Sequence, residues 1–436
     1  MVPWHASVII RAVQYADLFK ALIQRPVILI SFLGLLAGVL VARSWGVKQS
    51  HKSGERVERL KPELPQVPTE GEYVSSNRCQ ACHESEHASW ERTFHRTMTQ
   101  AALPGNVVGA FDGTTISSEG LEYRVFEEEN QFWVEMPDPD EMMYVVQGGK
   151  KLAFEDIPRV RLPVVMATGS HHYQTYWVPS PRHDQLLQTL PLVYLIEDKQ
   201  WIPREAAFMR SPNDRGHLVT QWNHHCIRCH STGGNPGLNS KTGMLETKVG
   251  ELGIACEACH GPGEEHVRFY QDPVNRYRSH FEETVAPTIV NPANLDHRAS
   301  SQVCGQCHGV FITREEYAME YAYKGVQYRP GEDLDKTRYY IQHPNNDASE
   351  NRKVELEKNP EFFRERWWND GSILAGGREY TAMSVSRCYT QGEISCLSCH
   401  SMHDSDPVDQ LNLDMDTSPA LRNSLFFAPE SGVGCH

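Results

Sequence analysis

The cysteines and histidines of this chain share one repeated pattern, Cys-x-x-Cys-His, which occurs five times and uses ten of the twelve cysteines. The cysteine pairs are Cys79 and Cys82, Cys226 and Cys229, Cys256 and Cys259, Cys304 and Cys307, and Cys396 and Cys399. Two thiols at this spacing can add to the two vinyl groups of one porphyrin, and the imidazole that follows can bind its iron. The pattern therefore predicts five covalently attached haem c groups, with His83, His230, His260, His308 and His400 as proximal iron ligands.

Structural zinc is the main alternative for paired cysteines, because Cys-x-x-Cys units also make tetrahedral zinc sites. Zinc sites combine such units in twos, whereas this chain has five units, and zinc does not require a histidine after each second cysteine. A thioredoxin-like redox motif would occur once. Haem attachment is the interpretation that accounts for all the copies. The two remaining cysteines, Cys388 and Cys435, could form a disulfide outside the cytoplasm.

The second axial ligand decides what each iron can do. A second histidine gives a low-spin electron carrier, whereas an open position lets a substrate bind. The candidates for the second ligand are His95, His172, His266, His297 and His403, with His171 as the alternative to His172 and with Met98 or Met402 as replacements for one histidine. Five further histidines remain open as candidates: His217, His224, His225, His280 and His343. His266 and His403 follow their own proximal histidines closely and are tethered on the proximal side. We therefore expect each of these two to bind the iron of a neighbouring haem.

Composition and charge narrow the class of protein. The chain has 436 residues, 40% of them hydrophobic and 22% charged, and a mean hydropathy of −0.50, which fits a mostly soluble protein of two or three domains. Its net charge is −14, with 42 basic against 56 acidic residues. A nucleic-acid-binding protein would carry a basic surplus, so we expect no nucleic-acid partner.

The N-terminal region predicts an anchor. Residues 26–42 are seventeen residues without a charge, and we expect a transmembrane helix over residues 26–45, near the short limit for a membrane span. A cleaved signal peptide is the alternative. Residues 1–25 are interpreted as an amphipathic segment on the cytoplasmic surface. Residues 46–72 are polar, contain prolines and read as a linker.

The orientation of this anchor involves a conflict. Lys and Arg are more numerous after the span than before it, so the positive-inside rule alone would keep the following part in the cytoplasm. Haem c is attached on the outer side of the membrane, however, and long domains translocate largely regardless of flanking charge. We therefore expect a single-pass protein of the inner (cytoplasmic) membrane, with its haem domain in the periplasm or otherwise outside the cytoplasm.

The body of the chain divides around a stretch without motifs. Residues 73–101 form the first haem segment, and residues 216–436 form a haem domain with four motifs, loops and short helices. Between them, residues 102–215 contain aromatic and β-branched runs, which predict strands over residues 121–126, 131–136, 142–147, 173–178 and 190–196. The expected fold class is a mainly α and irregular multihaem cytochrome c fold, with a small antiparallel β insertion and an N-terminal transmembrane helix.

Several local blocks resemble a known family. Residues 79–98 (CQACHESEHASWERTFHRTM), 169–177 (GSHHYQTYW), 222–232 (WNHHCIRCHST), 256–267 (CEACHGPGEEHV), 303–309 (VCGQCHG) and 395–404 (SCLSCHSMHD) are similar to bacterial multihaem c-type cytochromes related to the tetrahaem electron acceptor of hydroxylamine oxidoreductase. The resemblance covers roughly residues 73–405. It implies periplasmic electron transfer through stacked, mostly bis-histidine haems. This chain differs in having five motifs and an N-terminal apolar segment, and it lacks the Cys-x-x-Cys-Lys site of ammonia-forming nitrite reductases.

Three functional hypotheses follow. The first is a membrane-anchored cytochrome of a respiratory chain that relays electrons between a quinone-linked or periplasmic redox donor and an acceptor. The second is an oxidoreductase that acts on hydroxylamine, nitrite or a sulfur oxyanion at one five-coordinate haem, with His171, His172 and Tyr173 beside the open iron. The third is an electron-transfer subunit of a larger respiratory complex. The number of motifs and the supply of spare histidines favour the first.

Overall fold

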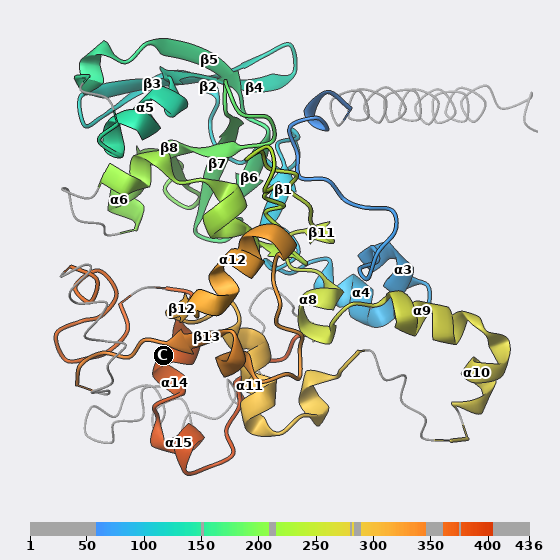
Figure 1. The fold of residues 1–436 in the computed structure, drawn as a ribbon. Coiled ribbons are helices and arrows are strands. Elements are labelled where there is room, and N and C mark those ends of the chain that lie inside the picture. Colours follow the sequence, from blue (N-terminus) through green and yellow to red (C-terminus); the bar gives the residue numbers. More distant parts are fainter. Residues whose placement is uncertain are drawn as a thin grey trace, which may run out of the picture. The chain divides into compact units, whose positions relative to one another are not determined.

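The computed structural model describes residues 58–149, 152–208, 215–279, 281–282, 289–345, 361–374 and 376–403. The chain divides into two compact units, Met1–Arg59 and Leu60–His436. The elements described below belong to the second unit, and Figure 1 shows its β-rich part and its helical part.

A four-stranded antiparallel sheet follows the chain order β2-β3-β4-β5. Its strands are β2 (Asp112–Ser118), β3 (Leu121–Glu128), β4 (Gln131–Pro137) and β5 (Arg159–Pro163). The turn between β2 and β3 contains Glu119 and Gly120, which both have positive φ angles, 53° and 77°. This backbone conformation is typical of a two-residue hairpin turn. The turn therefore determines the position of Glu119.

A second antiparallel sheet has the order β1-β6-β7-β8-β9. Its strands are β1 (Thr99–Ala101), β6 (Met166–Thr168), β7 (Tyr173–Pro179), β8 (Leu187–Leu195) and β9 (Gln200–Pro203). The edge strand β1 directly follows the first haem segment and pairs with β6. The first motif is thereby tied to the sheet, although β6 lies more than 60 residues later in the chain.

The two sheets share one apolar core. Along β3, Leu121, Tyr123 and Val125 are buried while the residues between them are exposed, which is the alternation expected of a strand with one covered face. These side chains pack with Tyr176 of β7 and Leu190 of β8, among others. Burial of this apolar face supplies most of the driving force for the β-rich part.

Strand β8 is covered on both faces, since eight of its nine residues are buried. Its second face belongs to another apolar cluster, in which Leu187 packs with Trp177 of β7 and with Trp222 and Ile227 from the second motif region. Because Ile227 lies between the two cysteines of that motif, the sheet holds the second motif directly.

The helical part consists of short elements (Figure 1). The helices are α3 (Ser76–Gln80), α4 (Glu84–Trp90), α7 (Ile227–His230), α8 (Cys256–His260), α9 (Glu264–Gln271), α10 (Pro273–Arg278), α11 (His297–Gly305), α12 (Glu315–Lys324), α14 (Glu379–Met383) and α15 (Arg387–Thr390), with single turns η3 (Trp222–Cys226), η4 (Pro292–Asn294), η5 (Leu334–Lys336) and η6 (Cys396–Ser398). Two short ladders join them, β10 (Ser231–Thr232) with β11 (Glu251–Leu252) and β12 (Phe311–Thr313) with β13 (Arg338–Tyr340).

The expected fold class is wrong. The described residues form four antiparallel sheets, one of four strands, one of five and two of two, so this part of the chain is mixed α and β rather than mainly α. Within the described residues, no helix combines the length and the apolar character needed to cross a membrane. The segment expected to be the anchor, residues 26–45, lies outside the described residues, as do residues 1–25.

The individual strands were easier to predict than the fold class. Four of the five expected runs form β3, β4, β7 and β8. The fifth, residues 142–147, lies instead in helix α5 (Pro139–Val146). The Asp138 side chain accepts hydrogen bonds from the N–H groups of Asp140 and Glu141, and Pro139 occupies the first helical turn. Both features favour the start of a helix, and they outweigh the strand preference of the apolar run that follows.

Candidate haem sites

Each motif closes one turn of backbone. The N–H of the motif histidine donates to the carbonyl of the first cysteine in the first, fourth and fifth motifs, at 2.9, 3.0 and 3.0 Å. In the second and third motifs, His230 and His260 end the short helices α7 and α8. One turn therefore carries both thiols and the imidazole, as haem attachment requires.

Three of the motif histidines face a second imidazole. The ring centres of His83 and His266 lie 6.5 Å apart, those of His308 and His95 lie 6.2 Å apart, and those of His260 and His403 lie 6.3 Å apart. Two imidazoles that bind one metal ion from opposite sides, through bonds of roughly 2 Å, have ring centres about 6.3 Å apart. The spacing of all three pairs thus fits an iron held between two histidines.

The partner in each pair comes from another motif's segment. His266 lies on α9, just after the third motif, yet it faces His83 of the first. His403 follows the fifth motif and faces His260 of the third. His95 follows the first motif and faces His308 of the fourth. Each of the three ring contacts therefore joins two different motif segments, and together they connect four of the five.

His297 lies close to the fifth motif. It begins α11, and Ser301 and Cys304 follow on the same face, four and seven residues later. The thiol of Cys396 lies close to Ser301 and Cys304, and η6, which carries Cys396, contacts α11. The buried Nε2 atom of His297 has no hydrogen-bond partner among the described residues. His297 is therefore well placed to serve the iron of the fifth motif.

His172 is placed differently from the other four candidates. Its ring stacks on His171 with centres 3.8 Å apart, and His171 stacks on Phe94 at 4.0 Å. Both histidines are exposed. Among the described ring contacts, none joins His172 to a motif histidine.

A further buried imidazole, His87, was not among the candidates. Both of its ring nitrogens are buried without a hydrogen-bond partner in the described residues, and its ring packs edge-on against Trp90 at 5.2 Å. It stands four residues after His83, where the sequence offers no signal that separates it from an ordinary helical residue.

The second motif has a cationic surrounding. Burial, together with the charges of Arg378, His308 and Arg204, lowers the pKa of His230 to about 4. The same two arginines act on Tyr173, whose pKa burial raises. Arg378 donates to the carbonyl of Cys307 at 3.2 Å, which brings it between the second and fourth motifs. Of the residues expected beside an open iron, Tyr173 is in this environment, whereas both arginines were missed.

The motifs also contact one another through their cysteines. The thiols of Cys79 and Cys256 lie close together, on helices α3 and α8 that contact each other, so the first and third motifs are neighbours. The thiol of Cys229 likewise lies close to that of Cys307, and the thiol of Cys304 lies close to that of Cys396, so the fourth motif is next to the second and the fifth. Gln306 completes the series, because its amide donates to the carbonyl of Ala258 in the third motif at 2.8 Å.

Two of the proximal histidines have an acceptor next to Nδ1, which orients the imidazole ring. The Nδ1 atom of His308 lies 3.0 Å from Oε2 of Glu379, and that of His260 lies 2.7 Å from the carbonyl oxygen of Val290. Burial would raise the pKa of Glu379, but the hydrogen bond and charge of His308 hold it at about 2. Such contacts fix the ring and leave Nε2 to face the metal.

Glu257 holds the helix that carries His266. Its carboxylate accepts the N–H of Val74 at 2.8 and 3.0 Å and that of Gly263, directly before α9, at 2.7 Å. Burial raises the pKa of Glu257 to about 7, against the effect of these hydrogen bonds. The residue therefore links the start of α9 to the chain that enters the first motif.

Comparison with known proteins agrees with the motifs. Residues 200–261, which include the second and third motifs, match the family of cytochrome c554 and c-prime. Among solved structures, the outer cell wall cytochrome OcwA matches with a TM-score of 0.43 and 17% identity over 76% of this chain and 56% of that one. An undecahaem cytochrome from the S-layer of Carboxydothermus ferrireducens matches with a TM-score of 0.32 and 18% identity, over 80% of this chain and 42% of that one. Curated protein sequences give no match.

The family match and the motifs together support a multihaem c-type cytochrome with a role in electron transfer. The matched region is much shorter than residues 73–405, over which the sequence resembles the family. The link to hydroxylamine oxidoreductase stays a prediction. This chain spans 56% and 42% of the lengths of the two solved structures.

Proposed function

We propose that this chain is a pentahaem c-type cytochrome that relays electrons between redox partners. The proposal rests on the three histidine pairs with ring centres 6.2–6.5 Å apart, each of which includes a motif histidine. Two imidazoles on one iron leave no open coordination position, which suits an iron to electron exchange rather than to substrate binding. When bound, haem supplies one-electron redox chemistry.

The chain's own residues provide a continuous arrangement for that chemistry. Cysteine contacts connect the first motif to the third and the fourth motif to both the second and the fifth, and Gln306 connects the third to the fourth. All five attachment sites are therefore neighbours of at least one other site. Glu379 and the carbonyl of Val290 keep two of the imidazoles in a fixed orientation, so little rearrangement accompanies a change of charge.

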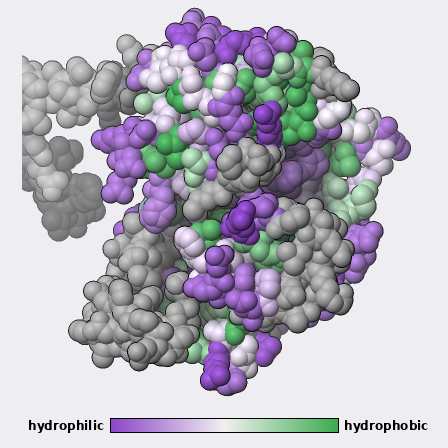
Figure 2. Space-filling model, turned by 90° about the vertical axis from the view of Figure 1, so that its left-hand side faces the viewer, coloured by the Kyte–Doolittle hydropathy of each residue, from purple (hydrophilic) through white to green (hydrophobic). Residues whose placement is uncertain are grey.

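The partners follow from this role. We propose quinone-linked or periplasmic redox proteins as donor and acceptor, with the haem domain outside the cytoplasm, where haem c is attached. On the face shown in Figure 2, hydrophilic side chains are widespread, and the chain as a whole is acidic with a net charge of −14. Such a surface favours brief, charge-guided encounters with basic partners. A stable place in a larger respiratory complex is the other form that this function could take.

A second candidate function is favoured by the surroundings of His230. Arg204 and Arg378 act on both His230 and Tyr173, and no described ring contact pairs His230 with a second histidine. Two cations and a phenol would attract a small anion such as nitrite or a sulfur oxyanion and could supply a proton to it. The second motif would then be the catalytic one, and the other four would deliver electrons.

Coulometric titration tests the relay. The proposal predicts uptake of five electrons per chain under a low-potential reductant and their full return to an oxidant. Uptake of fewer than five electrons by a protein with all haems attached would contradict it.

Anion titration separates the two functions. If the second candidate is right, nitrite or sulfite added to the oxidised protein changes the absorption of one haem in five, and the reduced protein turns the anion over. Tyr173→Phe should then slow turnover, while Tyr144→Phe, at an exposed tyrosine of α5, should not. Unchanged spectra and no turnover would exclude the second candidate and leave the relay.

A further inference from the structure

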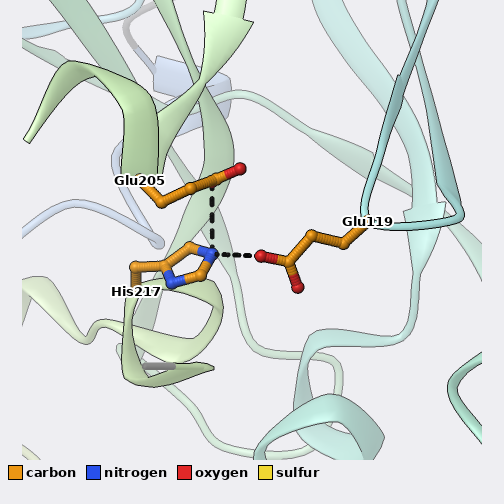
Figure 3. Close-up of side chains that lie close together, drawn as sticks. All are labelled: Glu119, Glu205 and His217. Atoms are coloured by element: carbon orange, nitrogen blue, oxygen red, sulfur yellow. Dashed lines mark ion pairs between the residues drawn. The ribbon is translucent and has the colours of Figure 1, made fainter. Parts of the chain in front are cut away.

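Three ionisable side chains meet in the β-rich part, away from all the motifs. Figure 3 shows that Nε2 of His217 points between two carboxylates, 3.3 Å from Oε1 of Glu119 and 3.2 Å from Oε2 of Glu205. Each comes from a different element: Glu119 from the β2–β3 turn, Glu205 from α6 (Arg204–Ala207) and His217 from η2 (Arg215–Val219). All three ligand atoms lie within 4.8 Å of one another.

This cluster is poorly balanced as an ion pair. The His217 side chain is only 2% exposed, and those of Glu205 and Glu119 are 18% and 25% exposed. Two carboxylates facing one imidazole leave a net charge of −1 even when the imidazole is protonated. A net negative charge is costly where solvent is partly excluded, as it is around the His217 ring. A divalent cation bound to neutral His217 would bring the net charge to zero.

Two hydroxyls close to the cluster point to the same conclusion. The Tyr123 side chain is fully buried, and its hydroxyl has no hydrogen-bond partner among the described residues. The charges of Glu119 and Glu205 both act on it, since both raise its pKa in addition to burial. The hydroxyl of Ser118, next to Glu119 in the chain, is also buried without a partner in the part of the chain that the structure describes. Buried polar groups in such a position normally serve a ligand or its bound water.

The donor atoms indicate the class of metal. Calcium and magnesium prefer sites made of oxygen alone, whereas zinc and its neighbours accept imidazole nitrogen together with carboxylate oxygen. In a tetrahedral zinc site with bonds of 2.0–2.2 Å, two ligand atoms lie about 3.3–3.6 Å apart. The two observed separations, 3.2 and 3.3 Å, are close to this range.

We infer that Glu119, Glu205 and His217 bind a divalent transition-metal ion, with zinc(II) as the best match. The fourth position is taken by water, to which the hydroxyl of Tyr123 donates a hydrogen bond. The ion fastens the β2–β3 turn of the four-stranded sheet to the segment that follows β9 of the five-stranded sheet. Its role is structural, and it is independent of the haems.

Metal analysis of the full-length, haem-loaded protein tests the inference. After treatment with a chelator, the protein is titrated with zinc(II), and bound zinc and iron are counted in the same sample by mass spectrometry. We expect one zinc ion per chain, together with a rise in the unfolding temperature on zinc addition, because a ligand that binds only the folded state stabilises it. Calcium at the same concentration should produce neither effect.

Variants locate the ion. Glu119→Gln and Glu205→Gln should each weaken zinc binding at least about tenfold and abolish the rise in unfolding temperature, since each removes one charged ligand. Glu122→Gln is the matched control, because Glu122 is exposed on β3 three residues after Glu119. Chelator-treated wild type is informative even if a variant fails to fold. If the chelator-treated wild type takes up no zinc, or if Glu119→Gln and Glu205→Gln bind zinc as well as the wild type, the inference is wrong and the cluster is a plain ion pair.

Discussion

His266→Ala should open one iron. The ring of His266 lies 6.5 Å from that of His83 and is the only described imidazole in ring contact with it. Removal of this ring leaves the iron of the first motif with His83 alone, and a five-coordinate ferric haem is high-spin. One haem of the five changes, so the low-spin signal in the electron paramagnetic resonance spectrum should fall by the equivalent of one haem per chain, and a high-spin signal of the same size should replace it.

Two companion variants separate ligation from a loss of structure. His266→Met offers the iron a thioether, so it should restore a low-spin haem at a higher midpoint potential. His225→Ala is the control, because His225 is exposed and its Nδ1 interacts with the carbonyl oxygen of Gln221. A folded His266→Ala protein with five haems and an unchanged low-spin signal would refute the pairing of His266 with His83.

Three further predictions concern other contacts around the motifs. The His95 and His308 rings are tilted by 74°, which brings the iron d orbitals close in energy, so this haem should give the most anisotropic low-spin signal, and His95→Ala should abolish it. Glu379→Gln removes the carboxylate that accepts from His308 and should raise the potential of that haem in a spectroelectrochemical titration; an unchanged potential would contradict this role. The pKa of Glu257 is raised to about 7 in the folded state, so protonation of this carboxyl group favours folding at low pH. As the pH rises from about 4.5 to 7, the protein should lose up to about 3 kcal/mol of its free energy of unfolding. Glu257→Gln should flatten this pH dependence of the denaturant midpoint, and an equal slope in both proteins would refute it.

The chemistry of this chain could be predicted because it is local in the sequence. Five residues define each attachment motif, so no knowledge of the fold is needed to find it. The candidates His266 and His403 were also suggested by their short distance from a motif. Their partners could not be predicted, because each pair joins residues from two motifs that only the fold brings together.

The surroundings of the motifs carried no such signal. Glu379 contacts His308 across 71 residues, and Arg378 reaches the carbonyl of Cys307 across the same interval. Nothing in the sequence near either partner marks these contacts. The metal cluster shows the same limit, since Glu119 and His217 are almost 100 residues apart.

The fold class was wrong for a related reason. The alternation of buried and exposed residues along β3 is visible in the sequence, and the strand was expected where it occurs. The strands β1 and β6 have only three residues each, too few for a pattern, and their pairing joins segments far apart in the chain. The sequence therefore predicted one small β insertion, whereas the structure has two packed sheets to which such short strands contribute.

The central claim is that the chain holds five haems whose irons are mostly closed by two histidines. The most direct test is low-temperature electron paramagnetic resonance of the oxidised full-length protein, with covalent haem and total protein measured in the same sample. The account predicts five haems per chain and low-spin ferric signals from at least the three haems whose histidine pairs are seen, those of His83, His260 and His308. Fewer than five haems per chain, or high-spin signals from most of them, would contradict it.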